Sequence, residues 1–465
     1  MAGLDESTFE GIHPARFLSF TIPSPSPSFT PPTLRVAVLD SPIQPDTADS
    51  PPVVAAMFVP KHRESDWIFS TEAGQLQLLL GSPNIQRLIL IGEHPVGGRF
   101  STTIYRRPLE TDSQKRLEES LIPLVTALAP KSCFINGSFN VPILSYEDNV
   151  VCSVVLEKCV GPVVGEMLVE DVEIESGGEG KREFRRRLRF KRLPNLVQTE
   201  IRIVPKTGFD SEKTEIGGNV EFQPDFLALV HVYLVPMVAS LALIASRIEE
   251  RIEAGFRPKA LCVGVGGGAL LGFLRSQLGF HVVGVEMDEE VLRIARRYFG
   301  LEVGDCIQLF VGDAIEFMKE LANQANNHKE MNDCCLETNN DDADPKFDVI
   351  MVDLDSSDMC SGVSAPPLEF VRKSVLLAAK SVLGESGIFV INVIPPSRLF
   401  YEKLIHQFKE VFHELYEIDS GNGENFVLIA KVLPTMSSIG DVENSFLKKL
   451  RLVVSGAYMD SIRKI

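Results

Sequence analysis

The sequence predicts an α/β protein with a doubly wound parallel sheet, preceded by a smaller α+β domain. Over residues 221–435, short apolar runs alternate with helical stretches, which is typical of a doubly wound sheet. A glycine cluster follows the first of these runs, and an acid about twenty residues later ends the second. Upstream, residues 53–220 contain short β-branched runs separated by Gly and Pro, with one helical stretch at 114–128.

The chain before the doubly wound region divides into two parts. Residues 1–52 are rich in Pro and Ser from position 21 onward, and such composition buries too little apolar surface to offset its ordering entropy. We therefore expect a flexible tail there, followed by an accessory domain. Within that domain, residues 181–192 contain eight basic residues in twelve. They are interpreted either as a phosphate or RNA contact or, more simply, as a solvated strand face paired with the acidic stretch 170–179.

The glycine cluster at 264–268 lies between the first two buried runs of the doubly wound region. Glycine adopts positive φ and lets a ligand approach the bare backbone. The second run ends in Glu286, whose carboxylate can accept hydrogen bonds from both hydroxyls of a ribose. We therefore expect Gly264, Gly266, Gly268 and Glu286 to bind a nucleoside-bearing cofactor. The spacing G-x-G-G-G differs from the G-x-G-x-x-G of dinucleotide folds, and no basic or hydroxyl residue follows to hold a pyrophosphate.

Two further acids follow later runs of the same region. Asp313, with Ala314 after it, ends one run and is suited to an adenine amino group, and Asp353 ends the buried run 347–352. A glycine loop, a ribose acid, an adenine acid and a fourth-strand acid, in that order, resemble the S-adenosylmethionine-dependent methyltransferases. The resemblance implies a Rossmann-like class I fold with S-adenosylmethionine as the cofactor. It also implies that Gly264, Gly266, Gly268, Glu286, Asp313 and Ala314 bind it.

The candidate catalytic residues follow from what methyl transfer requires. The reaction is an in-line displacement, so the protein aligns a neutral lone pair with the methyl carbon. An α-amino group has a pKa of about 7.7–8.0, against about 10.4 for lysine, so a weak base is enough to deprotonate it. The candidates for holding the amine and accepting its proton are Asp353, Asp355 and Asn392. The two acids lie in a loop that also holds Asp358, and Asn392 ends the next buried run.

A closer resemblance covers residues 53–465. The glycine loop, Glu286, Asp313 and the acid-rich loop resemble the spermidine-synthase-like branch of methyltransferases, which lacks the acid before the first glycine; Cys262 stands there in this chain. Residues 347–371, with stretches at 66–74, 168–172 and 185–193, are similar to the methyltransferase-like protein 13 family. These are the elongation factor 1-alpha lysine and N-terminal methyltransferases.

The family resemblance implies a protein substrate, the α-amino terminus of elongation factor 1-alpha, with Asp353, Asp355 and Asn392 holding the amine. In that family a separate amino-terminal domain methylates a lysine. Because this chain shows no second glycine loop with its acids, we expect the lysine activity to be absent.

Two other functions remain open. A polyamine aminopropyltransferase, which uses decarboxylated S-adenosylmethionine, carries a compact D-S-S-D-P loop, whereas the loop after Asp353 is two residues longer here. A non-catalytic binding module is the third interpretation, with residues 53–220 docking a partner and the cofactor fold serving as a scaffold.

Composition limits the partners and the compartment. A net charge of −17 argues against nucleic acid as a partner. The eight cysteines form no C-x-x-C pair and no zinc spacing with histidine, so we expect no metal and a cytoplasmic protein with reduced thiols. Residues 226–246 carry no formal charge, and we interpret them as a buried helix and not a membrane span. Monomer and homodimer are both left open.

The expected organisation has four parts, one of them with a polar, flexible insert. These are a flexible tail (1–52), an α+β accessory domain (53–220), a methyltransferase domain (221–435) with its insert at 323–345, and a terminal helical segment (436–465).

Overall fold

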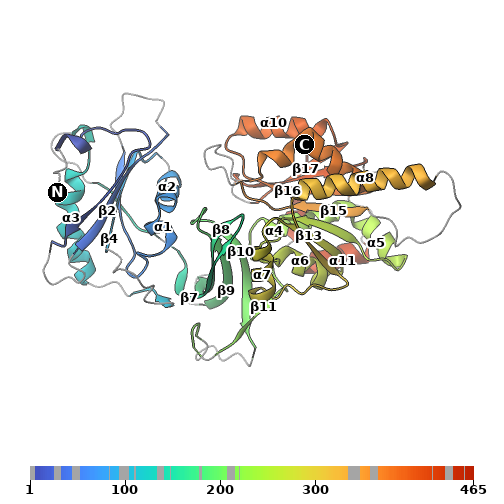
Figure 1. Cartoon of the computed structure of the whole chain (residues 1–465), viewed down its shortest axis with the longest axis horizontal. Coiled ribbons are helices and arrows are strands. Elements are labelled where there is room, and N and C mark those ends of the chain that lie inside the picture. The colour runs from blue at the N-terminus through green and yellow to red at the C-terminus, as the bar shows by residue number, and fades with distance from the viewer. Residues whose placement is uncertain are drawn as a thin grey trace.

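The chain forms three β-sheets, of which the first two interleave in sequence, since β5 (Ile104–Arg106) of the second sheet precedes β6 (Ile143–Leu144) of the first (Figure 1). The computed structural model describes residues 6–25, 33–43, 53–82, 84–93, 104–108, 112–133, 141–146, 148–176, 181–206, 215–218, 220–332, 346–356, 365–420, 423–434, 444–454 and 456–465.

The first sheet has five strands in the order β1-β2-β4-β3-β6, with α3 on one face and the short helices α1 and α2 on the other (Figure 1). Its strands are β1 (Phe17–Pro23), β2 (Thr33–Asp40), β3 (Val54–Phe58), β4 (Arg87–Glu93) and β6 (Ile143–Leu144). Its helices are η1 (Glu6–Phe9), α1 (Trp67–Ser70), α2 (Glu72–Leu80), α3 (Asp112–Ala127) and η2 (Lys131–Cys133).

The expectation of a flexible tail at 1–52 is wrong where the structure describes that segment. Strand β2 lies between β1 and β4, and Val36 and Val38 on it are fully buried. The run Thr-Leu-Arg-Val-Ala-Val-Leu-Asp has the apolar content of a core strand. The prediction failed because it rested on the Pro and Ser residues on both sides of this run. Burial against α3 supplies the apolar contact that the flanking composition lacks.

The second sheet has six antiparallel strands in the order β11-β10-β9-β8-β7-β5. They are β5 (Ile104–Arg106), β7 (Val150–Gly161), β8 (Gly165–Ser176), β9 (Lys181–Phe190), β10 (Val197–Pro205) and β11 (Phe222–Asp225). The region predicted as one accessory domain at 53–220 therefore holds parts of two sheets, and the last strand of the second sheet lies beyond residue 220. We call each sheet with the helices that cover it a unit, and number the units as the sheets. In Figure 1 the second unit lies between the first and the third.

The basic run 181–192 contains the whole of β9, and its arginines pair with acids on neighbouring elements. Arg186 makes two hydrogen bonds to Asp171 on β8, and Arg189 contacts Asp66 of the first unit. The pairing of these arginines with acids was expected, but the prediction that they form a solvent-exposed strand face is wrong. Arg186 and Arg189 are 8% and 5% exposed, because they lie where this sheet meets its neighbours.

The third sheet has eight strands in the order β14-β13-β12-β15-β16-β18-β17-β19, the first five parallel. They are β12 (Lys259–Val263), β13 (His281–Glu286), β14 (Ile307–Val311), β15 (Phe347–Val352), β16 (Leu383–Val393), β17 (Glu414–Asp419), β18 (Phe426–Lys431) and β19 (Arg463–Lys464). Because β13 and β15 flank β12 on opposite sides, the strand order reverses at β12, and ligands of such sheets bind outside that point. The predicted doubly wound, Rossmann-like fold is confirmed.

Helices cover both faces of the third sheet. One face carries α8 (Ala314–Asn332), η7 (Leu368–Val371), α9 (Lys373–Val382) and α10 (Arg398–Lys409). The other carries α4 (Leu234–Ala239), η3 (Ser240–Ile244), α5 (Ala245–Glu253), α6 (Ala269–Phe273), the π-helical turn η4 (Leu274–Leu278), α11 (Ser445–Val453) and α12 (Gly456–Asp460). Helix α7 (Glu289–Tyr298) lies toward the second sheet and packs against β7.

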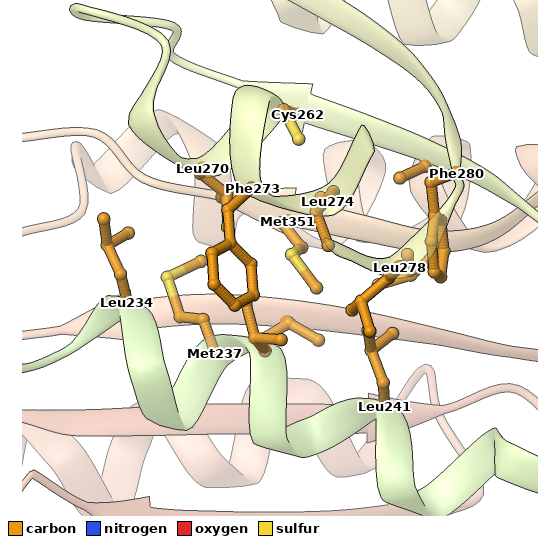
Figure 2. Packing of buried hydrophobic residues seen from close by; sticks show 14 of the residues in the cluster. Leu234, Met237, Leu241, Cys262, Leu270, Phe273, Leu274, Leu278, Phe280 and Met351 are labelled. Carbon is orange, nitrogen blue, oxygen red and sulfur yellow. The ribbon is translucent and has the colours of Figure 1, made fainter. Parts of the chain in front are cut away.

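The uncharged segment 226–246 is helical and packed in the core only from Leu234 onward, where it forms α4 and η3, whereas Leu227 and Val232 before it are exposed. Figure 2 shows Met237 and Leu241 facing the side chains of Phe273 and Leu278. Met237 and Leu241 are both fully buried. In the described residues, no helix is long and apolar enough to cross a membrane.

Two remaining boundaries also differ from expectation. The predicted insert at 323–345 begins as helix, since α8 continues to Asn332, and residues 333–345 lie outside the described residues. The terminal segment 436–465 contains the expected helices, α11 and α12, but its last residues add β19 to the sheet edge beside β17.

Candidate active site

The glycine loop after β12 requires glycine because neighbouring backbone approaches it closely. Gly264 has φ +84°, and a Cβ there would lie 2.2 Å from the carbonyl oxygen of Asp353. Gly268 has φ +82° and precedes α6. Between them, Gly266 has φ +52°. The loop therefore presents bare backbone at the switch point, beside the end of β15.

Glu286 at the end of β13 holds this loop in place. Its Oε2 accepts hydrogen bonds from the backbone N–H groups of Val265 at 3.0 Å and Gly266 at 3.3 Å, and its Oε1 accepts from Met287 at 3.0 Å. Burial raises the pKa of Glu286 above its ordinary value, against the lowering effect of these donors. The predicted ribose acid thus lies against the glycine loop, as expected.

The end of β14 lies directly beside Glu286. The N–H of Gly312 donates to the Glu286 carbonyl oxygen at 2.9 Å, and the exposed Asp313 caps α8 by accepting from the N–H of Ile315 at 2.7 Å. Ala314, the first residue of α8, is 6% exposed and packs in the core between this helix and the sheet. Two apolar side chains next to these acids are exposed to solvent: Met287 by 50% and Val311 by 57%.

Asp353 lies at the end of β15, on the other side of the glycine loop. Its Oδ2 accepts a hydrogen bond from the Tyr233 hydroxyl at 3.3 Å. Burial and the nearby charge of Asp355 raise the pKa of Asp353 to about 7, although the Tyr233 hydrogen bond acts in the opposite direction. The β15–β16 register pairs Val352 with Ile391, so Asn392, 4% exposed, follows on the neighbouring strand beside Asp353. Asp353 is therefore a carboxyl group poised to exchange a proton near neutral pH.

Asp355 is paired with an arginine of the second unit. Arg192 Nη2 donates to Asp355 Oδ1 at 3.2 Å and lies the same distance from Oδ2. Burial raises the pKa of Asp355, and the Arg192 charge opposes that rise. Asp358, the last acid of the predicted loop, lies outside the described residues.

The second sheet closes the site over the glycine loop, a contribution that the sequence reasoning missed. Thr199 Oγ1 on β10 accepts a hydrogen bond from the N–H of Gly267 at 2.8 Å. His231, near Tyr233, has its pKa lowered to about 4 by burial. Thr199, Arg192, His231 and Tyr233 lie outside the glycine and strand-end patterns, so no motif pointed to them.

The predicted site residues all lie at one edge of the third sheet, since the parallel strands β14, β13, β12, β15 and β16 end there. One group of potential metal ligands exists among the described residues, formed by Glu157, Cys159 and Glu290. Glu157 already accepts from Arg293 and Tyr298, and Glu290 from Arg293, so those carboxylates are engaged in ion pairs and hydrogen bonds.

Comparison with known proteins confirms the resemblance found in the motifs. No family model matches the chain. It is 28% identical to the eEF1A lysine and N-terminal methyltransferase of Bos taurus over 404 residues, 83% of this chain and 51% of the relative. With that of Homo sapiens it shares 27% over 419 residues, 87% of this chain and 54% of the relative. The chain therefore spans about half the length of the curated relatives it matches.

A solved structure of human methyltransferase-like protein 13 in complex with SAH is 26% identical. The match covers 49% of this chain and 93% of that one, with a TM-score of 0.39.

Proposed function

We propose that this chain is an S-adenosylmethionine-dependent protein methyltransferase whose acceptor is the α-amino terminus of eEF1A. The choice of acceptor is supported by sequence similarity to the eEF1A lysine and N-terminal methyltransferases over more than four fifths of the chain. The observation that carries the reaction class is the placement of Asp353. A carboxyl group with its pKa raised to about 7 lies next to a glycine loop held by a second carboxylate, Glu286.

The residues at the strand ends fit the cofactor. The glycine loop packs against Asp353 and Thr199 so closely that a Cβ would clash, and Glu286 is the acid for the ribose hydroxyls. Asp313 is the acid for the adenine amino group, and the exposed apolar side chains of Met287 and Val311 offer surface for a flat ring. When bound, S-adenosylmethionine supplies an electrophilic methyl group. The chain's own residues bind and orient the two reactants.

Asp353 accepts the proton of the incoming amine. Its pKa of about 7 lies close to the value of about 7.7–8.0 for an α-amino group, so the transfer costs little. The Tyr233 hydroxyl orients the carboxylate, and Asn392 offers an amide oxygen to a second amine hydrogen. Only the ionised form of Asp353 accepts a proton, so turnover is expected to rise as pH increases through about 7.

Mass spectrometry of recombinant eEF1A, with its initiator Met removed, tests the proposal after incubation with the chain and S-adenosylmethionine. Methyl groups on the amino-terminal peptide support it. Methylation of an internal lysine, or no transfer, overturns it. In the second case, aminopropyl transfer to putrescine from the decarboxylated cofactor would establish the polyamine enzyme. If calorimetry then detects no cofactor binding, the binding module is the better interpretation.

Two variants assign the chemistry to Asp353. Asp353→Asn is expected to lose most of its turnover while S-adenosylhomocysteine affinity, measured by calorimetry, stays within about twofold, because the role of Asp353 is with the amine. Asp305→Asn, which changes an exposed carboxylate between β13 and β14, is the matched control. Full activity of Asp353→Asn would move the role to Asp355.

A further inference from the structure

Several side-chain atoms around Asp353 are buried without a hydrogen-bond partner among the residues that the structure describes. They are Arg192 Nε, His231 Nε2 and Asn392 Oδ1. Buried polar atoms are nearly always paired, because leaving one unpaired carries a free-energy penalty. A polar substrate that fills this space would pair them, so their chemical types describe the substrate.

The set contains donors as well as acceptors. The Nε–H of Arg192 can only donate, since a guanidinium has no acceptor, whereas Asn392 Oδ1 can only accept. A ligand that satisfies both must therefore bring an acceptor as well as an N–H donor. An amine on a methylene chain brings donors alone.

Arg192 is held in one orientation. Its Nη2 lies 3.2 Å from both carboxylate oxygens of Asp355, and its guanidinium carbon lies 5.3 Å from the centre of the Phe190 ring. This pairing leaves the Nε–H as the unpaired donor. It also neutralises Asp355, so a second ammonium entering the site would meet the Arg192 guanidinium and not a free carboxylate.

We propose that Arg192 determines substrate specificity by donating its Nε–H to the carbonyl oxygen of the substrate's first residue, while Asp353 and Asn392 accept from the α-amine. This inference rests on the proposed function and narrows its substrate to a peptide amino terminus. An amino-terminal residue carries its amine and its carbonyl oxygen within three covalent bonds, N–Cα–C=O. A lysine side chain has no acceptor near its amine, and a diamine brings a second positive charge.

A double-mutant cycle between Arg192 and that carbonyl tests the proposal. The protein is saturated with S-adenosylhomocysteine, and calorimetry measures binding of two peptides carrying the amino-terminal sequence of eEF1A without the initiator Met. One peptide is unmodified, and in the other the first carbonyl is replaced by a methylene. We expect the wild type to prefer the unmodified peptide by about 10- to 100-fold, the range for a hydrogen bond from a charged donor. Arg192→Met should reduce that preference to about threefold or less.

Control measurements separate this role from a structural one. Arg182→Met changes a half-exposed arginine on β9, the strand that precedes Arg192, and this arginine pairs with Glu173; the variant should keep the wild-type preference. Arg192→Lys, which retains charge without the guanidinium, should lose the preference as Arg192→Met does, while both keep their affinity for S-adenosylhomocysteine. In addition, 1,4-diaminobutane should compete with the peptide at least tenfold better in Arg192→Met than in the wild type.

The outcomes distinguish the two levels of the argument. If the unmodified peptide binds and is methylated, but its preference over the methylene analogue is the same in wild type and Arg192→Met, this inference is overturned and the proposed function stands. If the wild type neither binds nor methylates the peptide, the proposed function fails and this inference fails with it.

Discussion

Replacing Asp353 by Asn should stabilise the third unit, and the gain should grow with pH. The pKa of this carboxyl group rises from 3.8 to about 7 on folding. A group whose folded pKa is raised contributes stability at low pH that is lost as pH rises through the folded value. Asn cannot ionise, so the variant avoids the cost of holding a buried negative charge above pH 7.

The magnitude follows from the two pKa values. One pKa unit corresponds to 1.36 kcal/mol, so the full shift amounts to about 4 kcal/mol at high pH. At pH 5 the carboxyl group is still neutral in the folded state, whereas in the unfolded state it is mostly ionised. Less than half of the full amount of about 4 kcal/mol is therefore lost at that pH. The stabilisation by Asp353→Asn, relative to wild type, should therefore increase by about 2–3 kcal/mol between pH 5 and pH 8.

The assay must report on the third unit. Tryptophan fluorescence does not, because the single tryptophan, Trp67, lies on α1 in the first unit. Hydrogen exchange by mass spectrometry in increasing urea, followed on peptides covering β15, gives the local unfolding free energy at each pH. Asp305→Asn serves as the surface control. A gain for Asp353→Asn that is flat, or that declines toward pH 8, would refute the argument from burial.

Two other substitutions test how the site is assembled. Glu286→Ala should weaken S-adenosylmethionine binding by about 1.5–3 kcal/mol in calorimetry, because it removes a charged acceptor that also anchors the glycine loop; unchanged affinity would mean that the ribose acid is elsewhere. Asp288→Ala should destabilise the contact between the second and third units by about 2–3 kcal/mol, since it leaves the N–H groups of Val163 and Val164 without their acceptor. Exchange rates of the β7–β8 turn measure this, and the exposed Glu289→Ala is the control.

Much of the cofactor side of the site could be predicted from the sequence because its signals are local. Gly264 and Glu286 each belong to a short strand-and-turn pattern, and parallel strands bring their carboxyl ends to one edge. Asp353 and Asn392 follow from the same rule, since each stands at the end of a buried run in the same sheet. Strands β1 and β2 of the first sheet were missed for the opposite reason: the apolar strand β2 is surrounded by composition typical of a linker.

Only the tertiary structure decided what faces these strand ends. Arg192 meets Asp355 across 163 residues, Tyr233 meets Asp353 across 120, and Thr199 meets the glycine loop across 68. Such contacts depend on how the second sheet and the segment before α4 pack against the third sheet, and no local periodicity or spacing encodes that packing. The sequence by itself therefore determined the glycine loop and the acids at the strand ends, whereas the packing of the sheets determined the pairing of Asp355 and the burial that raises the pKa of Asp353.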